Sequence, residues 1–189
     1  KTQHRDAFEN LIKSFHTVIL NIRSIPHPVI ASVQGAVAGA GISLMLACDL
    51  AIAGESAFFT LAYCHIGASP DGGSTYFLPQ TVGLKRSLEI ALLGNRFDAL
   101  CAEKWGLINR VVTDEKLHRE TRDLATKLSK GPSFAYRQAK KLMNQESQIS
   151  LETQLNREST AFANCSLTQD FNEGVTAFIN KRKPNFIGK

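Results

Sequence analysis

Two short stretches of this sequence combine residue types that suit acid–base chemistry. The first is the run from Gln34 to Asp49 (QGAVAGAGISLMLACD), which places four small residues, 38–41, before an apolar helix. A turn of small residues lets a ligand approach the backbone closely, and the first N–H groups of a helix have no partner within it. Such groups can stabilise a negative oxygen without a charged side chain. The stretch therefore predicts an oxyanion site.

The second stretch follows about 30 residues later, in the turn GASPDGGS from Gly67 to Ser74. It contains one carboxylate, Asp71, directly after Pro70, at the expected start of another helix. Proline is tolerated in the first turn of a helix, and aspartate is favoured beside its positive end. Asp71 is therefore a candidate acid/base residue that faces the oxyanion site. Capping of the helix is the alternative role for an aspartate in this position.

Length and composition indicate a chain with room for one hydrophobic core. The 189 residues are 43% hydrophobic and 21% charged, which fits one globular domain rather than a disordered chain. No apolar run reaches the ~18 residues of a membrane span, and no signal peptide opens the sequence, so we expect a cytoplasmic protein without a membrane partner. The missing initiating Met and the polar start predict that the sequence is incomplete at its N-terminus.

The charged and sulfur-containing residues argue against several function classes. The net charge of +5 has no nucleic-acid recognition motif beside it, so no nucleic acid is expected as a partner. Its densest groups, Lys140–Lys141 and Lys181–Lys183, are expected on solvated helix faces or beside a phosphate-rich ligand. The four cysteines form no C-x-x-C pair, which favours reduced, buried thiols. The five histidines lack metal-ligand spacing, so no metal site is expected.

Apolar spacing, prolines and glycines predict the elements that must position the two stretches. An amphipathic helix over 6–22 is expected to bury one face and to end before Pro26. This face consists of Phe8, Leu11, Ile12, Phe15, Val18, Ile19 and Ile22. Strands are predicted at 29–33, 49–53 and 107–112, and an extended wall at 57–66. Further helices are predicted at 42–47, 71–78, 84–93, 99–105, 114–129, 133–144, 150–164 and 168–181. Strands thus alternate with helices before an all-helical tail.

Several segments match one known family when they are taken together, in their order and spacing. They are Pro28–Ala31, Gln34–Gly41, Cys48–Asp49, Ile66–Gly67, Pro70–Ser74, Gly94–Arg96, Ala99–Trp105, Gly106–Ile108, Glu173–Phe178 and Lys181–Phe186. Over nearly its whole length the sequence thus resembles the crotonase (enoyl-CoA hydratase/isomerase) superfamily. The resemblance implies an α/β, crotonase-like (ClpP/crotonase) fold, a spiral of β-β-α units with a C-terminal helical trimerisation region. It implies a single domain over 1–189, with a spiral core at 1–112 that lacks its N-terminal strands, a helical region at 113–189, and a homotrimer or hexamer.

The resemblance also implies a substrate and a binding mode. Family members bind acyl-CoA thioesters, so coenzyme A would enter as part of the substrate and no cofactor is expected. They hold the thioester oxygen with two backbone N–H groups, one of which carries over to Ala40. The turn that supplies the second has no counterpart in this sequence. Phe178 and Lys181 match positions that reach the CoA moiety; core packing and solvation are their alternatives. The predicted substrate pocket consists of Gly39, Gly41, Ser43, Leu61, Tyr63, His65 and Gly72.

The acid/base position selects the reaction class. Family hydratases use two glutamates, and the corresponding positions here are Ser43 and Tyr63. Asp71 stands where a subset of the isomerases place a single acid, as in the branch of 1,2-epoxyphenylacetyl-CoA and Δ3,Δ2-enoyl-CoA isomerases. One carboxylate can take a proton from one carbon and return it to another, which moves a C=C bond. The resemblance therefore predicts an isomerase of fatty acid or phenylacetate metabolism. The alternatives are a hydratase and a non-catalytic module that binds acyl-CoA or a protein.

Overall fold

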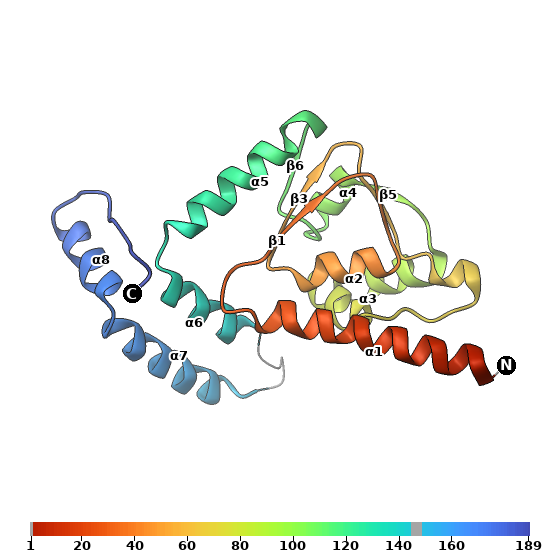
Figure 1. Ribbon diagram of the computed structural model, residues 1–189, viewed down its shortest axis with the longest axis horizontal. Coiled ribbons are helices and arrows are strands. Elements are labelled where there is room, and N and C mark those ends of the chain that lie inside the picture. Colours follow the sequence, from red (N-terminus) through yellow and green to blue (C-terminus); the bar gives the residue numbers. More distant parts are fainter. Residues whose placement is uncertain (1, 145–148) are drawn as a thin grey trace. The chain divides into compact units, whose positions relative to one another are not determined.

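The computed structural model describes residues 2–144 and 149–189, which form two compact units (Figure 1). The first unit runs to Thr121 and contains both stretches with candidate chemistry. The second unit contains the remaining residues, Arg122–Lys189, together with Pro26–Pro28. Helix α5 (Asp114–Ser129) begins in the first unit and ends in the second. The expectation of a single domain stays a prediction.

Two three-stranded sheets form the frame of the first unit in the described part of the chain. One sheet is parallel and has the order β1 (Ile30–Val33), β3 (Leu50–Gly54), β6 (Arg110–Val112). The other has the order β2 (Ala36–Ala38), β4 (Phe58–Thr60), β5 (Phe97–Asp98). In it β4 is parallel to β2 and antiparallel to β5. The first four strands thus alternate between the two sheets, whereas β4 and β5 follow one another in the same sheet.

The chain repeats a β-β-α pattern. Each repeat ends in a helix that starts within one of the two stretches with candidate chemistry. β1 and β2 lead into α2 (Ala40–Ala47), and β3 and β4 lead into α3 (Ser74–Leu93). Helix α3 breaks at Gly83, where φ is 75° and ψ is 161°, so the two helices predicted for this region are confirmed as two parts of one kinked element. The short helix α4 (Ala99–Lys104) follows β5, and Asp98 caps it by accepting a hydrogen bond from Cys101 N–H at 2.8 Å.

The core of the first unit lies between the sheets and the helices α2 and α3. Its fully buried large side chains include Ile42, Ile52, Phe59, Leu61 and Leu78. Each such side chain contributes roughly 1.5–3 kcal/mol by its removal from water. Helix α2 is apolar on nearly every face because it is enclosed by this core, as the sequence predicted.

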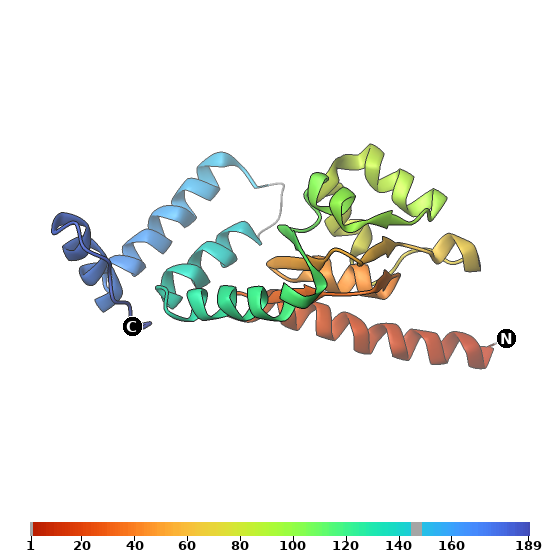
Figure 2. The same ribbon diagram turned by 90° about the horizontal axis from the view of Figure 1, so that it is seen from above.

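The prediction of a buried face on the first helix is wrong for three of its seven residues. Helix α1 (Thr2–Ser24) buries Ile19, whereas Phe8, Leu11 and Val18 are exposed. The helix lies along α2, but its N-terminal half extends beyond it (Figures 1 and 2). Apolar spacing reveals that a helix has one hydrophobic face, but it does not reveal how much of that face finds a neighbour in the same chain.

The predicted extended wall at 57–66 is wrong beyond Thr60. A 3₁₀ turn, η1 (Tyr63–Ile66), follows β4, between left-handed backbone at Ala62 (φ 54°) and Gly67 (φ 67°). The structure also adds the strands β2 and β5, which the sequence did not predict, and it starts the strand predicted at 107–112 only at β6. These strands have two or three residues each, too few for an alternating pattern to be recognised.

The helices of the second unit agree closely with the predicted ones. They are α6 (Ser133–Met143), α7 (Leu151–Ser166) and α8 (Gln169–Ile179), with the C-terminal part of α5. Ser150 caps α7 through Thr153 N–H at 3.2 Å, and Thr168 caps α8 through Phe171 N–H at 3.1 Å. In the described residues, no helix combines the length and apolarity that a membrane crossing requires.

Candidate active site

Asp71 lies in a loop that side chains from three elements hold in place. The Tyr63 hydroxyl of η1 donates a hydrogen bond to Oδ1 of the Asp71 carboxylate. The main-chain carbonyl of Asp71 accepts from Ser43 Oγ of α2 at 2.8 Å and from Ser74 Oγ of α3 at 3.1 Å. Ser43 and Ser74 are both fully buried. The backbone of Asp71 is therefore fixed from the interior, and its carboxylate is oriented by Tyr63.

The helix-capping alternative for Asp71 does not fit this arrangement. Helix α3 begins at Ser74 rather than at Asp71, and its N-cap is Gly73, without a side-chain hydrogen bond to the cap. The prediction that the helix starts directly at Asp71 is therefore wrong. Two glycines with positive φ, Gly72 and Gly73, separate Asp71 from the helix and turn the chain before it. The carboxylate is left to interact with Tyr63.

The glycine-rich turn leads directly into helix α2. Gly39 has φ 50° and ψ −116°, which favours glycine, and its N–H donates to the Thr60 carbonyl at 3.0 Å. Helix α2 then begins at Ala40. The N–H of a first helical residue has no acceptor within its helix. In this turn Ile42 N–H is the group that bonds back to the Gly39 carbonyl, at 3.0 Å. The Ala40 N–H thus keeps its capacity to donate.

Tyr63 contacts both the glycine-rich turn at Gly39 and the loop that contains Asp71. A Cβ atom at Gly39 would lie 3.6 Å from the Tyr63 ring, so the glycine-rich turn packs directly against the tyrosine that holds Asp71. Burial raises the pKa of Tyr63 to about 12, and the hydrogen bond to the Asp71 carboxylate acts in the same direction. Tyr63 is therefore a protonated hydrogen-bond donor throughout the neutral pH range. The family resemblance predicts Tyr63 as a pocket residue, but it does not predict the contact between Tyr63 and Asp71.

Some of the other predicted pocket residues lie beside Asp71, and others do not. Gly72 adjoins Asp71 and packs against Ser43, whereas Leu61 is fully buried in the core. Gly41 lies in the first turn of α2, where a Cβ atom would be 3.8 Å from Val37. The His65 side chain contacts the residue after α3, with Nε2 at 3.0 Å from the Gly94 carbonyl oxygen. Ser43, Tyr63 and Gly72 are thus brought together with Asp71. The Leu61 carbonyl accepts from Tyr63 N–H, whereas the His65 side chain contacts Gly94.

Gly72 provides a direct test of the packing around Asp71. Its φ is 62°, and an added Cβ atom would meet the Phe15 ring and lie 2.8 Å from Ser43 Cβ. We expect Gly72→Ala to lower the free energy of unfolding by about 2–5 kcal/mol, from overpacking and left-handed backbone strain together. Gly67→Ala is the matched control, because Gly67 has φ 67° and open space around it. Urea unfolding should show the larger loss for Gly72→Ala; equal losses would contradict the packing described here.

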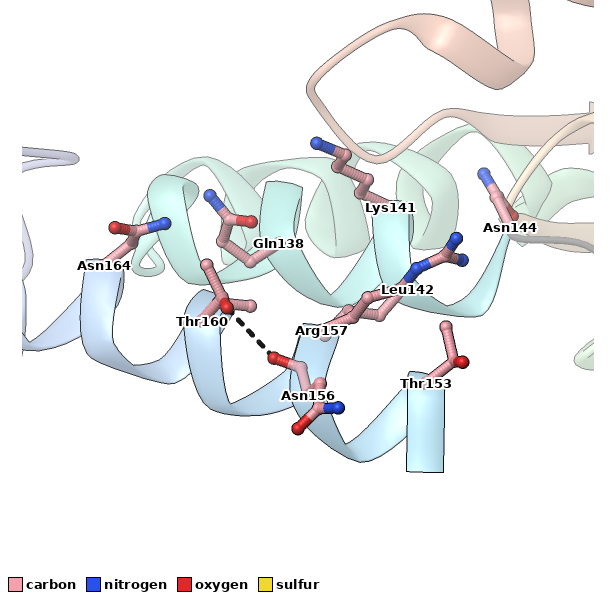
Figure 3. Close-up of a pocket in the computed structure, with 10 residues that line it drawn as sticks. Gln138, Lys141, Leu142, Asn144, Thr153, Asn156, Arg157, Thr160 and Asn164 are labelled. Carbon is pink, nitrogen blue, oxygen red and sulfur yellow. Dashed lines mark hydrogen bonds between the residues drawn. The ribbon is translucent and has the colours of Figure 1, made fainter. Parts of the chain in front are cut away.

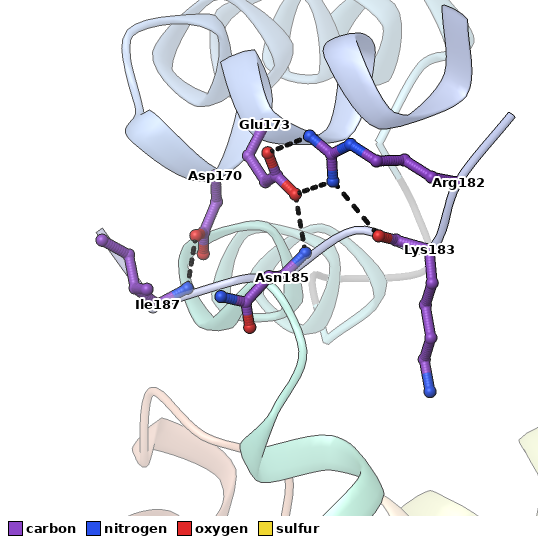
Figure 4. A network of polar contacts seen from close by, with 6 residues as sticks. All are labelled: Asp170, Glu173, Arg182, Lys183, Asn185 and Ile187. Carbon is purple, nitrogen blue, oxygen red and sulfur yellow. Dashed lines mark hydrogen bonds and ion pairs between the residues drawn. The ribbon is translucent and has the colours of Figure 1, made fainter. Parts of the chain in front are cut away.

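The two predicted CoA contacts lie at the end of α8, in the second unit. Phe178 is 86% exposed, so the core-packing alternative for it is wrong. Lys181 follows the helix with left-handed backbone (φ 52°) and is exposed. Beside it, Arg182 donates two hydrogen bonds to the Glu173 carboxylate, at 2.6 and 2.8 Å, and Asn185 N–H donates a third at 2.7 Å (Figure 4). The chain after α8 is thereby folded back along the helix.

The buried carboxylate of Asp170 holds the last residues of the chain. It is 2% exposed, and one oxygen accepts from Ile187 N–H at 2.7 Å (Figure 4). The other oxygen accepts from Gly188 N–H at 2.9 Å. Asp170 N–H in turn donates to the Lys189 carbonyl at 2.9 Å. Two acidic residues in the first turns of α8 thus fix the C-terminal segment, and the sequence analysis predicted neither role.

The contacts of Glu173 predict a dependence of stability on pH. Arg182 and Asn185 N–H lower the pKa of Glu173 from 4.5 to about 2. Because the pKa is lower in the folded state, the stabilisation is complete above about pH 4.5 and is lost as the pH falls towards 2. We expect the stability difference between wild type and Glu173→Gln to be constant near neutral pH and to shrink over this acidic range. Urea titrations check it, with the exposed Glu158→Gln of α7 as the control; a difference that does not change with pH would contradict it.

A cavity of about 810 Å³ lies within the second unit, and none of the predicted site residues lines it. Amide, hydroxyl and cationic side chains of α6 and α7 line it, among them Gln138, Lys141, Asn156 and Arg157 (Figure 3). One lining residue, Lys141, belongs to a basic pair noted in the sequence, but no cavity was predicted there. In the described ranges 2–144 and 149–189, no three His, Cys, Asp or Glu side chains are grouped in a way that could hold a metal ion.

This chain is similar to known proteins of one family over most of its length. A family model described as enoyl-CoA hydratase/isomerase matches residues 2–189. The 1,2-epoxyphenylacetyl-CoA isomerase of Escherichia coli (strain K12) is 38% identical over 175 residues, which cover 93% of this chain and 67% of that protein. A protein named "Probable enoyl-CoA hydratase" from Rhodobacter capsulatus is 38% identical over 189 residues, which cover all of this chain and 71% of that protein.

Solved structures share the fold. The crystal structure of an enoyl-CoA hydratase from Polaromonas sp. JS666 superposes with a TM-score of 0.90 at 33% identity, and the match covers 99% of this chain and 76% of that one. The relatives bear both isomerase and hydratase names, so their names do not select one of the two reactions for this chain.

Proposed function

Because this chain belongs to the enoyl-CoA hydratase/isomerase (crotonase) family and has its crotonase-like fold, we propose that it binds an acyl-CoA thioester and shifts a C=C bond of the acyl chain. The observation that carries this proposal is the arrangement around Tyr63, which joins the Asp71 carboxylate to the turn that presents the Ala40 N–H. Asp71 is the acid/base residue in this account, and Ala40 N–H is an oxyanion donor. The reaction needs no cofactor.

The proposed reaction moves one proton between two carbons. Asp71 takes a proton from C2 of a 3-enoyl thioester, and the electron pair of the broken C–H bond moves towards the thioester oxygen, which gives a dienolate. The Ala40 N–H donates a hydrogen bond to this oxygen; in comparable sites one such donor is worth about 2.7–4 kcal/mol. Asp71 then returns the proton to C4, and the product is the 2-enoyl thioester. Atoms and charge balance without a water molecule.

The side chains beside Asp71 favour this shift over the addition of water. Hydration requires one group to activate a water molecule and one to deliver a proton. The neighbours of Asp71 are Ser43, which is fully buried and bonded to the backbone, and Tyr63, which has its pKa raised to about 12. Neither is a base near neutral pH. A single carboxylate is sufficient for a proton shift.

Proton exchange in D2O tests the proposal. The protein is incubated with a 3-enoyl-CoA and with its 2-enoyl isomer, and NMR follows deuterium at C2 and C4 together with the position of the double bond. We expect interconversion of the two isomers. A 3-hydroxyacyl-CoA as the main product would show a hydratase instead. Binding without interconversion of the isomers and without exchange at either carbon would show a non-catalytic module.

A further inference from the structure

The two oxygens of the Asp71 carboxylate differ in their hydrogen bonding. Oδ1 accepts the hydrogen bond from the Tyr63 hydroxyl. In the part of the chain that the structure describes, no hydrogen bond from a protein group to Oδ2 is recorded. An ionised carboxylate has about four acceptor positions on its two oxygens, so a single donor on Oδ1 leaves Oδ2 able to accept a proton.

The backbone holds Tyr63 in position for this contact. Tyr63 N–H donates to the Leu61 carbonyl at 2.7 Å, and its own carbonyl accepts from Ala68 N–H at 3.0 Å. Ala62, just before it, has left-handed backbone (φ 54°), which is costly for a residue with a side chain. On its other side the ring packs against Gly39. The hydroxyl is therefore presented by a rigid turn rather than by a flexible side chain.

Two basic side chains on the neighbouring elements, Arg23 and His65, make contacts away from the Asp71 carboxylate. On α1, the Arg23 guanidinium lies 5.2 Å from the centre of the Phe77 ring of α3. His65 of η1 contacts the Gly94 carbonyl. The α2 residue that faces the loop is Ser43, which is uncharged and bonds to the Asp71 backbone. Tyr63 is thus the titratable group whose contact with the Asp71 carboxylate is recorded.

We propose that Tyr63 is a positioning residue for the double-bond shift: its hydroxyl holds Oδ1 of Asp71 so that Oδ2 carries the proton between the two carbons. The inference rests on the proposed function and adds a role to it. Because one oxygen is held, the carboxylate keeps one orientation while the proton is in transit, and the proton that leaves C2 is the one returned to C4. A carboxylate that rotates freely would instead exchange this proton with solvent before returning it.

Tyr63→Phe removes one oxygen atom and keeps the ring that packs on Gly39. We expect kcat to fall about 10- to 100-fold through the misplaced carboxylate, while KM changes by less than about 2-fold, because Tyr63 contacts Asp71 rather than the substrate. In D2O, the deuterium incorporated per double-bond shift should rise. Tyr76→Phe is the matched control, because Tyr76 is 50% exposed on α3, and it should match wild type in both measurements.

The outcomes separate the two claims. If the wild type shifts no double bond, the proposed function fails and the positioning role fails with it. If the wild type is active and Tyr63→Phe shows the same kcat and the same deuterium content per turnover, the positioning role alone is overturned. A higher KM with unchanged kcat would also overturn it, because Tyr63 would then be a substrate contact.

A titration of tyrosine absorbance tests the contact without any turnover. The absorbance change of wild type that is absent from Tyr63→Phe belongs to the ionisation of Tyr63. In wild type this ionisation should occur near pH 12. Because the Asp71 charge and hydrogen bond help to raise this pKa, it should fall in Asp71→Asn. An unchanged Tyr63 ionisation in Asp71→Asn would show that the two side chains do not interact, and would overturn the proposal.

Discussion

Replacement of Asp71 by asparagine is expected to lower the rate of the double-bond shift by about 10²- to 10⁴-fold, the usual contribution of a positioned acid/base group. The amide has the size of the carboxylate, and its oxygen can still accept from Tyr63, so the loop should keep its structure. The main-chain contacts from Ser43 and Ser74 do not involve the side chain and are retained. What is lost is the basic oxygen. Initial rates with a 3-enoyl-CoA, together with the melting temperature, measure the effect.

A second aspartate provides the control for this substitution. Asp98 caps α4 through Cys101 N–H at 2.8 Å and has no part in the proposed chemistry. Asparagine caps helices as well as aspartate does, so Asp98→Asn should keep both activity and stability. If Asp71→Asn kept more than about half of the wild-type rate, Asp71 would not be the acid/base residue. A large loss of stability in Asp71→Asn would indicate a structural role instead.

Ala40→Pro is expected to lower kcat about 10²- to 10³-fold, because it deletes the N–H that is proposed to bind the thioester oxygen. Ala40 is the first residue of α2, where proline is well tolerated because this N–H has no partner within the helix. The substitution therefore removes one hydrogen-bond donor at little cost in stability. Rates with a 3-enoyl-CoA, and the unfolding free energy in urea, separate the two effects.

Two controls accompany this variant. Ala40→Gly keeps the N–H and should keep most of the activity. Leu151→Pro places proline at the first position of α7, where the side chain is 73% exposed, and should leave the rate unchanged. If Ala40→Pro turned over substrate as fast as Ala40→Gly, the donor on the thioester oxygen would have to be another group.

The sequence alone predicted those parts of the structure that local chemistry determines. The helices of the second unit are bounded by side chains that cap them, such as Ser150 and Thr168, and by Pro132, so their ends could be read directly. The strands β1 and β3 are apolar runs before turns and were found as well. Asp71 and Ala40 were selected by their turns and by the resemblance to a family, and the structure connects their surroundings through Tyr63.

Other features depend on distant parts of the chain and gave no local signal. The turn at Tyr63 follows a left-handed alanine, Ala62, and nothing in the residue type alanine predicts this conformation. Strand β2 exists because β4 pairs with it, which its three residues do not reveal. The exposed face of α1 shows the same limit, since the periodic pattern marks Phe8 and Leu11 as apolar without specifying a neighbour for them. Long-range pairing and packing decided each of these cases.

The central claim is that Ala40 and Asp71 act on the same thioester, and a crystal structure with a bound, unreactive acyl-CoA tests it most directly. We predict the thioester oxygen at about 2.7–3.1 Å from Ala40 N, with the Asp71 carboxylate beside C2 and C4 of the acyl chain. A thioester bound elsewhere, for example in the cavity between α6 and α7, or one with its oxygen turned away from Ala40, would contradict the account.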